Sequence, residues 1–173
     1  RILVMSATLD AQRVAGLLGD APIIEAGGRM FPVDCHYLPQ ARDARLDQGI
    51  AQAAQRALKE SEGDALVFLP GAGEIRSAQR LLEKTLPDVA VRPLYGDLPS
   101  SEQDLALAPD ARQRRKIILA TNIAQTSLTV EGVTSVIDSG LVRVARFDLG
   151  AGANRLETLR VSRASADQRA GRA

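Results

Sequence analysis

Hydroxyl, amide and guanidinium side chains are concentrated in three short segments of the sequence. The segments are MSAT at 5–8, ATNIAQTS at 120–127 and QRAGR at 168–172. None of them holds the paired carboxylates of a general acid–base site. Hydrogen-bond donors combined with arginine suit phosphoryl groups, because they bind phosphate oxygens and stabilise the charge that develops during phosphoryl transfer. The segments therefore indicate a site that holds phosphates.

Apolar runs typical of buried strands precede these segments and alternate with stretches of helical periodicity. RILVM at 1–5, DALVF at 64–68 and KIILA at 116–120 are such runs, and helical spacing of apolar residues is clear in 46–60. This alternation predicts an α/β fold with a mainly parallel sheet flanked by helices. In such sheets ligands bind at the carboxyl ends of the strands, where helix N-termini present free N–H groups.

Two other stretches depart from this alternation. Residues 19–33 contain two prolines and several glycines and are interpreted as a linker, with the main domain beginning near Phe31. Residues 141–148 and 154–161 alternate apolar and charged side chains on either side of LGAGA at 149–153. That pattern predicts a β-hairpin near the C-terminus with one face in water.

Composition excludes several classes of protein. Apolar residues make up 45% of the 173 residues and the formal net charge is +1, so binding of nucleic acid through bulk positive charge is not indicated. No apolar run approaches the length needed to span a membrane. Cys35 and His36 are the only cysteine and histidine, too few for an internal disulfide or a zinc site. We expect no metal site, no membrane partner and a reducing, cytoplasmic location.

Each polar or charged string also has a plain structural interpretation. SAT can cap a helix, and ATNIAQTS can be a loop of turn-forming residues. GAGE at 71–74 lacks the third glycine of a dinucleotide-binding fingerprint and is interpreted as a helix start. RQRRK at 112–116 either touches phosphates or forms a solvated loop before a strand, and the hairpin arginines either contact nucleic acid or protect a sheet edge.

The order of the strings is more informative than any one of them. Five strings resemble, in the order in which they occur, motifs III to VI of superfamily 2 helicases. They are SAT, VFLPGAGEI, PLYGDLP, ATNIAQTSLTVEGV and SADQRAGRA. FLPGAGEI, RVARFD and VSRASADQRAGRA are most similar to the DEAH-box/RHA branch, and the resemblance covers the whole chain. It implies a RecA-like fold of the P-loop NTPase type, in which two such domains bind ATP between them and a single strand crosses both.

The resemblance also implies how the chain is divided. Residues 1–27 would be the C-terminal tail of the first RecA-like domain with its linker, and residues 28–173 the second, helicase C-terminal domain, ending within motif VI. No GxxxxGK[ST] string occurs in the sequence. We therefore expect that string, the DEAH motif and the Mg²⁺ ligands in a first domain upstream, and expect this piece alone to be inactive.

The resemblance assigns roles to individual residues. In motif VI, Arg172 matches an arginine finger, Gln168 the residue that positions the γ-phosphate and attacking water, and Arg169 a partner of the acidic motif across the cleft. Nucleotide-facing positions in and after motif V, of which the acidic one would bind ribose, are Ser127, Thr129 and Glu131. The positions that would hold the nucleic-acid backbone are Thr121, Asn122 and Gly71. Ser6 and Thr8 would couple the state of the bound nucleotide to binding of the nucleic-acid strand.

The chain departs from the family pattern at two informative positions. Gln125 stands where glutamate is usual in motif V. Leu107 stands where many eukaryotic relatives have a phenylalanine that stacks on adenine, so low base selectivity is expected.

Three functions follow from these observations. The leading hypothesis is the second domain of an ATP-driven helicase that moves along a single strand, with RNA expected rather than DNA, and with the first RecA-like domain as its partner. The alternative is a RecA-like module that binds nucleic acid or protein without hydrolysis. A dinucleotide-dependent enzyme is disfavoured by the incomplete glycine fingerprint.

Overall fold

The structure is a computed structural model that describes residues 4, 11–24, 32–38, 45–126, 130–148, 150 and 152–173. The chain divides into two compact units, Arg1–Pro32 and Val33–Ala173, and each is considered by itself. The division falls within the segment 19–33 that the sequence predicts to be a linker.

The first unit contains one described helix, α1 (Ala11–Leu17). None of the described residues of this unit is buried, and the side chain of Leu17 is 79% exposed. The predicted strand at 1–5, apart from Val4, and the proposed coupling residues Ser6 and Thr8 lie outside the described residues.

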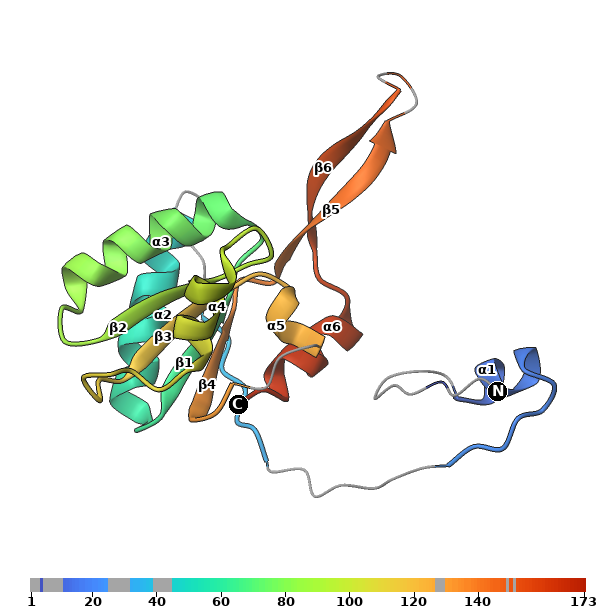
Figure 1. Ribbon diagram of the computed structural model, residues 1–173, viewed down its shortest axis with the longest axis horizontal. Coiled ribbons are helices and arrows are strands. Elements are labelled where there is room, and N and C mark those ends of the chain that lie inside the picture. Colours follow the sequence, from blue (N-terminus) through green and yellow to red (C-terminus); the bar gives the residue numbers. More distant parts are fainter. Residues whose placement is uncertain are drawn as a thin grey trace. The chain divides into compact units, whose positions relative to one another are not determined.

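The second unit is built on a four-stranded sheet whose order is β2-β3-β1-β4. Its strands are β1 (Asp64–Phe68), β2 (Ala90–Leu94), β3 (Lys116–Ala120) and β4 (Val133–Asp138). All three pairings within this sheet are parallel. The α/β fold with a mainly parallel sheet is therefore confirmed, and the carboxyl ends of the four strands lie on one edge (Figure 1).

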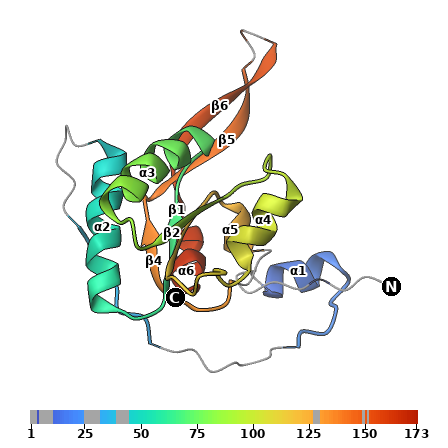
Figure 2. The ribbon, with the colours of Figure 1, turned by 60° about the vertical axis from the view of Figure 1, so that its left-hand side comes forward.

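Helices cover both faces of this sheet, so its central strands are apolar on both sides. In β1, Ala65 and Val67 pack with α2 (Leu46–Glu60) and α3 (Ala72–Thr85), whereas Leu66 and Phe68 pack toward α4 (Ser100–Leu107) and α5 (Ile123–Thr126). Figure 2 shows α2 and α3 together on one side of the sheet and α4 and α5 on the other. The last helix, α6 (Arg163–Ala170), packs against β4 and α5.

The predicted hairpin is confirmed as β5 (Leu141–Asp148) paired with β6 (Ala153–Arg160) in an antiparallel sheet of its own. It projects away from the parallel sheet in both ribbon views (Figures 1 and 2). Phe147 and Leu156, toward its far end, are 62% and 66% exposed.

The basic run RQRRK is used inside the domain. Arg115 donates to the backbone oxygens of Leu58 at 2.7 Å and Gly63 at 3.0 Å, which ties the end of α2 to the start of β3. Lys116 is 3% exposed, and its Nζ donates to the Ala108 oxygen at 2.8 Å at the end of α4. The run therefore satisfies carbonyls at helix ends, and the interpretation as a solvated loop is wrong for these two residues.

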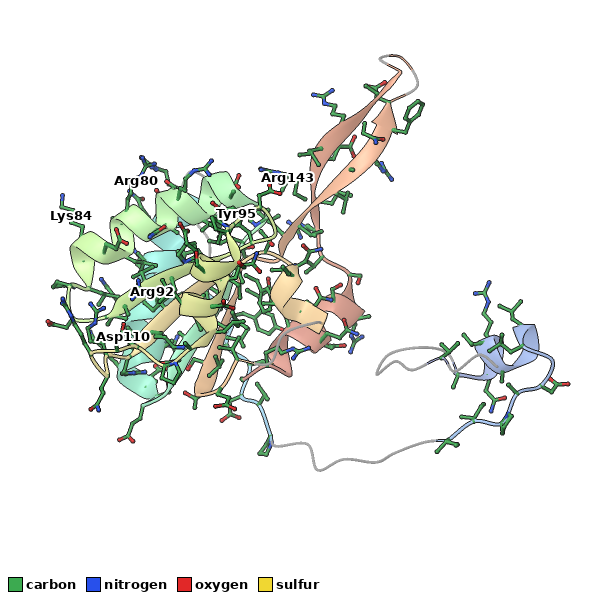
Figure 3. The ribbon with its side chains drawn as sticks, in the orientation of Figure 1. Arg80, Lys84, Arg92, Tyr95, Asp110 and Arg143 are labelled. Atoms are coloured by element: carbon green, nitrogen blue, oxygen red, sulfur yellow. The ribbon has the colours of Figure 1, made fainter. Side chains whose placement is uncertain are left out.

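Asp110 organises the loop before β3. Its carboxylate accepts from the Arg114 side chain at 3.1 Å and from Arg92 at 3.2 Å, and from the backbone N–H of Arg112 at 3.1 Å. Figure 3 shows Asp110 and Arg92 near each other at one end of the domain. Hydrogen bonds from the Arg114 side chain and from the backbone N–H groups of Arg112 and Arg114 outweigh burial and hold the pKa of Asp110 well below its usual range.

We expect Asp110→Asn to destabilise the second unit in a pH-dependent way. A carboxyl group with a lowered pKa in the folded state contributes stability above its unfolded pKa of about 3.9 and loses it as the pH falls toward the folded value. The difference in unfolding free energy between the two proteins should therefore be largest near neutral pH and shrink below about pH 4. Urea unfolding at pH 7, 4 and 2.5 measures it, and a pH-independent difference would contradict the role of the charge.

The helices of the described part are too short or too polar to cross a membrane.

Candidate functional site

The carboxyl edge of the parallel sheet is held together by backbone hydrogen bonds just beyond the strand ends. The N–H of Leu69 donates to the carbonyl oxygen of Ala120 at 2.9 Å, and the N–H of Thr121 donates to that of Leu94 at 3.2 Å. The N–H of Ser139 donates to the carbonyl oxygen of Phe68 at 3.1 Å. These bonds fix the starting points of the loops that carry most of the predicted site residues.

Gly71 begins the turn between β1 and α3, and it is buried beneath an arginine from the hairpin. A Cβ added at Gly71 would meet the Arg143 Nη1 at 2.5 Å and the Glu74 Oε2 at 3.1 Å. Arg143 and Glu74 form an ion pair of 2.7 Å, which joins the base of β5 to the first turn of α3 (Figure 3). A side chain at this position would displace the end of Arg143 from its place over the turn. Any backbone contact of Gly71 with nucleic acid remains a prediction.

Thr121 and Asn122 follow β3 and open α5. Thr121 is half-buried and Asn122 is exposed. The Thr121 carbonyl accepts from the N–H of Ala124 at 3.3 Å, and the Asn122 carbonyl accepts from the N–H of Gln125 at 3.0 Å. The two residues are placed together at the edge, and their contact with a strand remains a prediction.

The three predicted residues of motif VI lie on helix α6 and directly after it. Its N-cap is Ser162, whose Oγ accepts from the N–H of Ser165 at 3.2 Å. Gln168 and Arg169 lie in the last turn, and Arg172 follows the end of the helix. Short helices are marginal on their own, so the contact of Arg169 with β4 and the contacts of Gln168 and Arg172 with α5 hold α6 in place.

The guanidinium of Arg169 is the centre of those contacts. Its side chain is 1% exposed, and its Nη1 lies 2.7 Å from the Asp138 carboxylate at the end of β4. The same nitrogen donates to the Leu141 carbonyl at 3.4 Å, and the guanidinium lies 4.8 Å from the centre of the Phe68 ring. A buried charge needs this kind of pairing, because desolvation otherwise costs several kcal/mol. Arg169 is thus engaged inside its own domain, and a partner across a cleft remains untested.

Gln125, on α5, links this guanidinium to the rest of α6. Its Oε1 accepts from the Arg169 Nε at 3.3 Å. Its Nε2 donates to the Gln168 Oε1 at 2.8 Å and to the Ser165 Oγ at 3.1 Å. Its backbone carbonyl accepts from the Arg172 Nε at 3.0 Å. All three predicted residues of motif VI therefore contact Gln125.

Of the three nucleotide-facing residues predicted in and after motif V, Glu131 alone is among the described residues. Glu131 is exposed in the turn before β4. Ser127 and Thr129 lie outside the described residues, so the structure does not place them relative to Arg172. Leu107, at the end of α4, is partly buried against the apolar side chains that pack between the sheet and helices α4 and α5.

The donor set at this edge fits a phosphate-bearing ligand such as ATP. It consists of guanidinium, amide and hydroxyl groups, which bind phosphate oxygens without a metal ligand among them. Within the described ranges, no group of three or more His, Cys, Asp or Glu side chains is placed to hold a metal ion. Any Mg²⁺ carried by the nucleotide would need ligands from elsewhere.

Asp138 and Phe68 are the contributors that the sequence analysis missed. Asp138 closes an otherwise uncharged run, VTSVID, at the carboxyl end of a predicted strand. A carboxylate at the end of an apolar strand indicates a cationic partner nearby, and this was the signal available in the sequence. Nothing in the local sequence indicated that Phe68 supports a cation.

Comparison with known proteins gives consistent results. Residues 46–173 match the model of the helicase conserved C-terminal domain. Over the whole chain, 47% of residues are identical to ATP-dependent RNA helicase HrpB of Escherichia coli, of which the chain covers 22%. Identity to ATP-dependent RNA helicase HrpA of the same species is 40% over 99% of the chain, which covers 14% of that protein.

A solved structure agrees with this. The crystal structure of Escherichia coli DEAH/RHA helicase HrpB superposes with a TM-score of 0.87 over 97% of this chain and 22% of that one, at 47% identity. The chain therefore spans about a fifth or less of the length of these relatives.

We expect Asp138→Ala to destabilise the domain strongly, because it leaves the Arg169 guanidinium buried without its carboxylate. Breaking such a pair costs about 3 kcal/mol. Chemical unfolding followed by circular dichroism measures the change. Asp97→Ala, at an exposed position before α4, is the matched control and should change stability by less than about 0.5 kcal/mol. Equal effects of the two substitutions would contradict the importance of the pair.

Proposed function

We propose that this chain, which belongs to the helicase conserved C-terminal domain family, acts as the second RecA-like domain of an ATP-dependent RNA helicase. Its sequence is that of a DEAH-box helicase close to HrpB, which supports the proposal. In this proposal residues 1–27 end the first RecA-like domain and residues 28–173 form the second. The two relatives named above, HrpB and HrpA, carry the name ATP-dependent RNA helicase, which supports RNA as the strand and ATP as the nucleotide.

One observation carries the proposal beyond family membership. Gln168, on α6, and Arg172, just after it, both hydrogen-bond to Gln125 at the carboxyl edge of the sheet, beside the loop of Thr121 and Asn122. Coupling requires that the nucleotide site and the strand site lie on the same edge of the sheet. A shift of the loop between β3 and β4 would then move residues of both sites.

The proposed division of labour follows from side-chain chemistry. Arg172 supplies a permanently charged guanidinium to the triphosphate, and Gln168 supplies an amide to the γ-phosphate and the attacking water. Thr121 and Asn122 offer hydroxyl and amide groups to a backbone without reading sequence. Arg169 holds α6 in place through Asp138, and we assign it to positioning.

The first RecA-like domain is the proposed partner. It would supply the phosphate-binding loop, the DEAH motif and the ligands of Mg²⁺, and ATP would bring the two domains together. Binding and hydrolysis would then alternate closed and open arrangements, and the strand would move along. The lone cysteine supports a cytoplasmic location.

A RecA-like module that binds without hydrolysis is the second candidate. The Gln168 and Arg172 pair argues against it, because a passive binder has no use for groups that respond to a γ-phosphate. The experiment that separates the two is hydrolysis itself.

We expect Arg172→Ala in the full-length protein to lower RNA-stimulated ATP hydrolysis by roughly 10³- to 10⁵-fold, the range found for arginine fingers. The loss arises because charge developing on the γ-phosphate is no longer neutralised. Phosphate release with saturating ATP measures it. Arg163→Ala, an exposed arginine in the first turn of α6, is the control and should retain full activity. Near-normal turnover by Arg172→Ala would exclude the catalytic role.

We also expect the 173-residue chain alone to bind ATP weakly and not to hydrolyse it, since its sequence contains no GxxxxGK[ST] loop. Calorimetric titration and a phosphate-release assay check this. Tight ATP binding or turnover by the chain alone would contradict the domain assignment.

A further inference from the structure

We infer that Lys116 is a positioning residue for the nucleoside part of ATP. Together with Asp64 it joins the two residues expected at that end of the nucleotide, Leu107 beside the base and Glu131 at the ribose. The inference rests on the proposed function and deepens it, because it names what fixes the nucleoside end of the same site. Lys116 is 3% exposed, so it acts on the nucleotide only through these neighbours.

The first step is the end of α4, which carries Leu107. The Lys116 Nζ donates to three successive backbone carbonyls there, those of Ala108 at 2.8 Å, Ala106 at 3.3 Å and Leu107 at 3.5 Å. The last carbonyls of a helix have no partner within the helix and carry the negative end of its dipole, so an ammonium group stabilises them. Lys116 therefore fixes the backbone from which the Leu107 side chain extends.

The second step is the carboxylate of Asp64, the first residue of β1, which holds Lys116 in turn. Its Oδ1 accepts from the backbone N–H of Lys116 at 2.7 Å, and its Oδ2 lies 3.7 Å from the Nζ. The Asp64 side chain is only 16% exposed. A buried ammonium group needs such a counter-charge, because an unpaired charge is costly to desolvate.

The third step is the turn that carries Glu131, which the backbone of Asp64 fixes. The N–H of Asp64 donates to the carbonyl of Gly132 at 2.8 Å. Gly132 has a φ of 82°, in the left-handed region that favours glycine, so the turn closes directly against the start of β1. One set of hydrogen bonds thus runs from Leu107 to the residue next to Glu131.

The consequence is that the base contact and the ribose contact are held at a fixed separation. A leucine packs on a base through dispersion and apolar burial, which supply affinity with little selectivity and decline quickly with distance. Lys116 begins β3, whereas Thr121 follows its end, so this network lies at the other edge of the sheet from the proposed strand contact. Loss of Lys116 should therefore weaken ATP binding without slowing the chemical step.

Lys116→Met tests this in the full-length protein, as a double-mutant cycle with Leu107→Ala. Methionine keeps the apolar stem of lysine and removes the three donors and the charge. We expect KM for ATP in RNA-stimulated hydrolysis, and the Kd of a non-hydrolysable ATP analogue, to rise roughly fivefold or more, as when a leucine loses part of its burial. The kcat at saturating ATP should stay within about twofold of that of the unaltered protein.

The Leu107→Ala background separates positioning from general support. Leu107→Ala should itself raise KM, and adding Lys116→Met to it should raise KM by about twofold or less, because the side chain through which Lys116 acts is already gone. A merely structural role for Lys116 predicts the same factor in both backgrounds.

Asp64→Asn is the second variant, and it keeps the side-chain size and an acceptor for the N–H of Lys116. Its amide nitrogen would face the Nζ and place two donors against each other, so we expect KM to rise roughly threefold. This rise should also shrink in the Leu107→Ala background. Because Asp64→Asn leaves the lysine in place, it keeps the test decisive where Lys116→Met fails to fold.

Ser77→Ala is the control for lost stability. It removes the 2.8 Å hydrogen bond to Asp47 that joins α3 to α2, on the opposite face of the sheet from α4 (Figure 2). This variant should lower the unfolding temperature and leave KM unchanged.

Three results would overturn the inference while the proposed function stands. They are an unchanged KM for Leu107→Ala, a KM within about twofold of the unaltered value for the substitutions at Lys116 and Asp64, and equal factors in both backgrounds. A KM that simply follows the unfolding temperature across all variants, Ser77→Ala included, has the same meaning. If the unaltered protein hydrolyses no ATP with RNA present, the proposed function itself fails and the inference falls with it.

Discussion

The burial of one guanidinium determines how the candidate site is assembled. Arg169 is the largest of the fully buried side chains, and it sits where the ends of β1 and β4, the start of β5 and helices α5 and α6 come together. A buried charge needs a paired anion, and an acceptor and an aromatic face stabilise it further. Asp138, Gln125 and Phe68 supply these three, so elements distant in sequence are held in one arrangement.

The parallel sheet provides the rigid base for this arrangement. Alternate residues of β1 and β3 enter two separate apolar clusters, so the sheet is fixed from both faces and the register of its strand ends cannot slip without exposing a whole row. The loops at the carboxyl edge are short and begin from hydrogen-bonded positions such as Leu69 and Thr121. Side chains on those loops are therefore placed accurately even where their own segments are brief, as in the four residues of α5.

The sequence was sufficient for the elements and insufficient for their assembly. DALVF and KIILA were predictable as strands because each contains a continuous apolar run of four residues, ALVF and IILA. The hairpin was predictable because charged and apolar residues alternate on both sides of a glycine-containing turn. The ion pair of Arg169 with Asp138 was not predictable, since its partners are 31 positions apart and meet only through the strand order β2-β3-β1-β4. For the same reason Arg115 and Lys116 looked like solvent-facing charges, although both satisfy carbonyls at helix ends.

The hairpin gives the domain a lever arm. Each of its strands is eight residues long, about 26 Å when extended. The described side-chain links of the hairpin to the rest of the domain, such as that of Arg143 with Glu74, lie at its base. A tilt of about 10° at that pivot would carry the tip through roughly 5 Å at this length. Near the tip, Arg146 stands directly opposite Arg155 and forms an ion pair of 3.5 Å with Glu157 of the partner strand. A small rotation near the first turn of α3 would therefore be amplified at the tip of the hairpin.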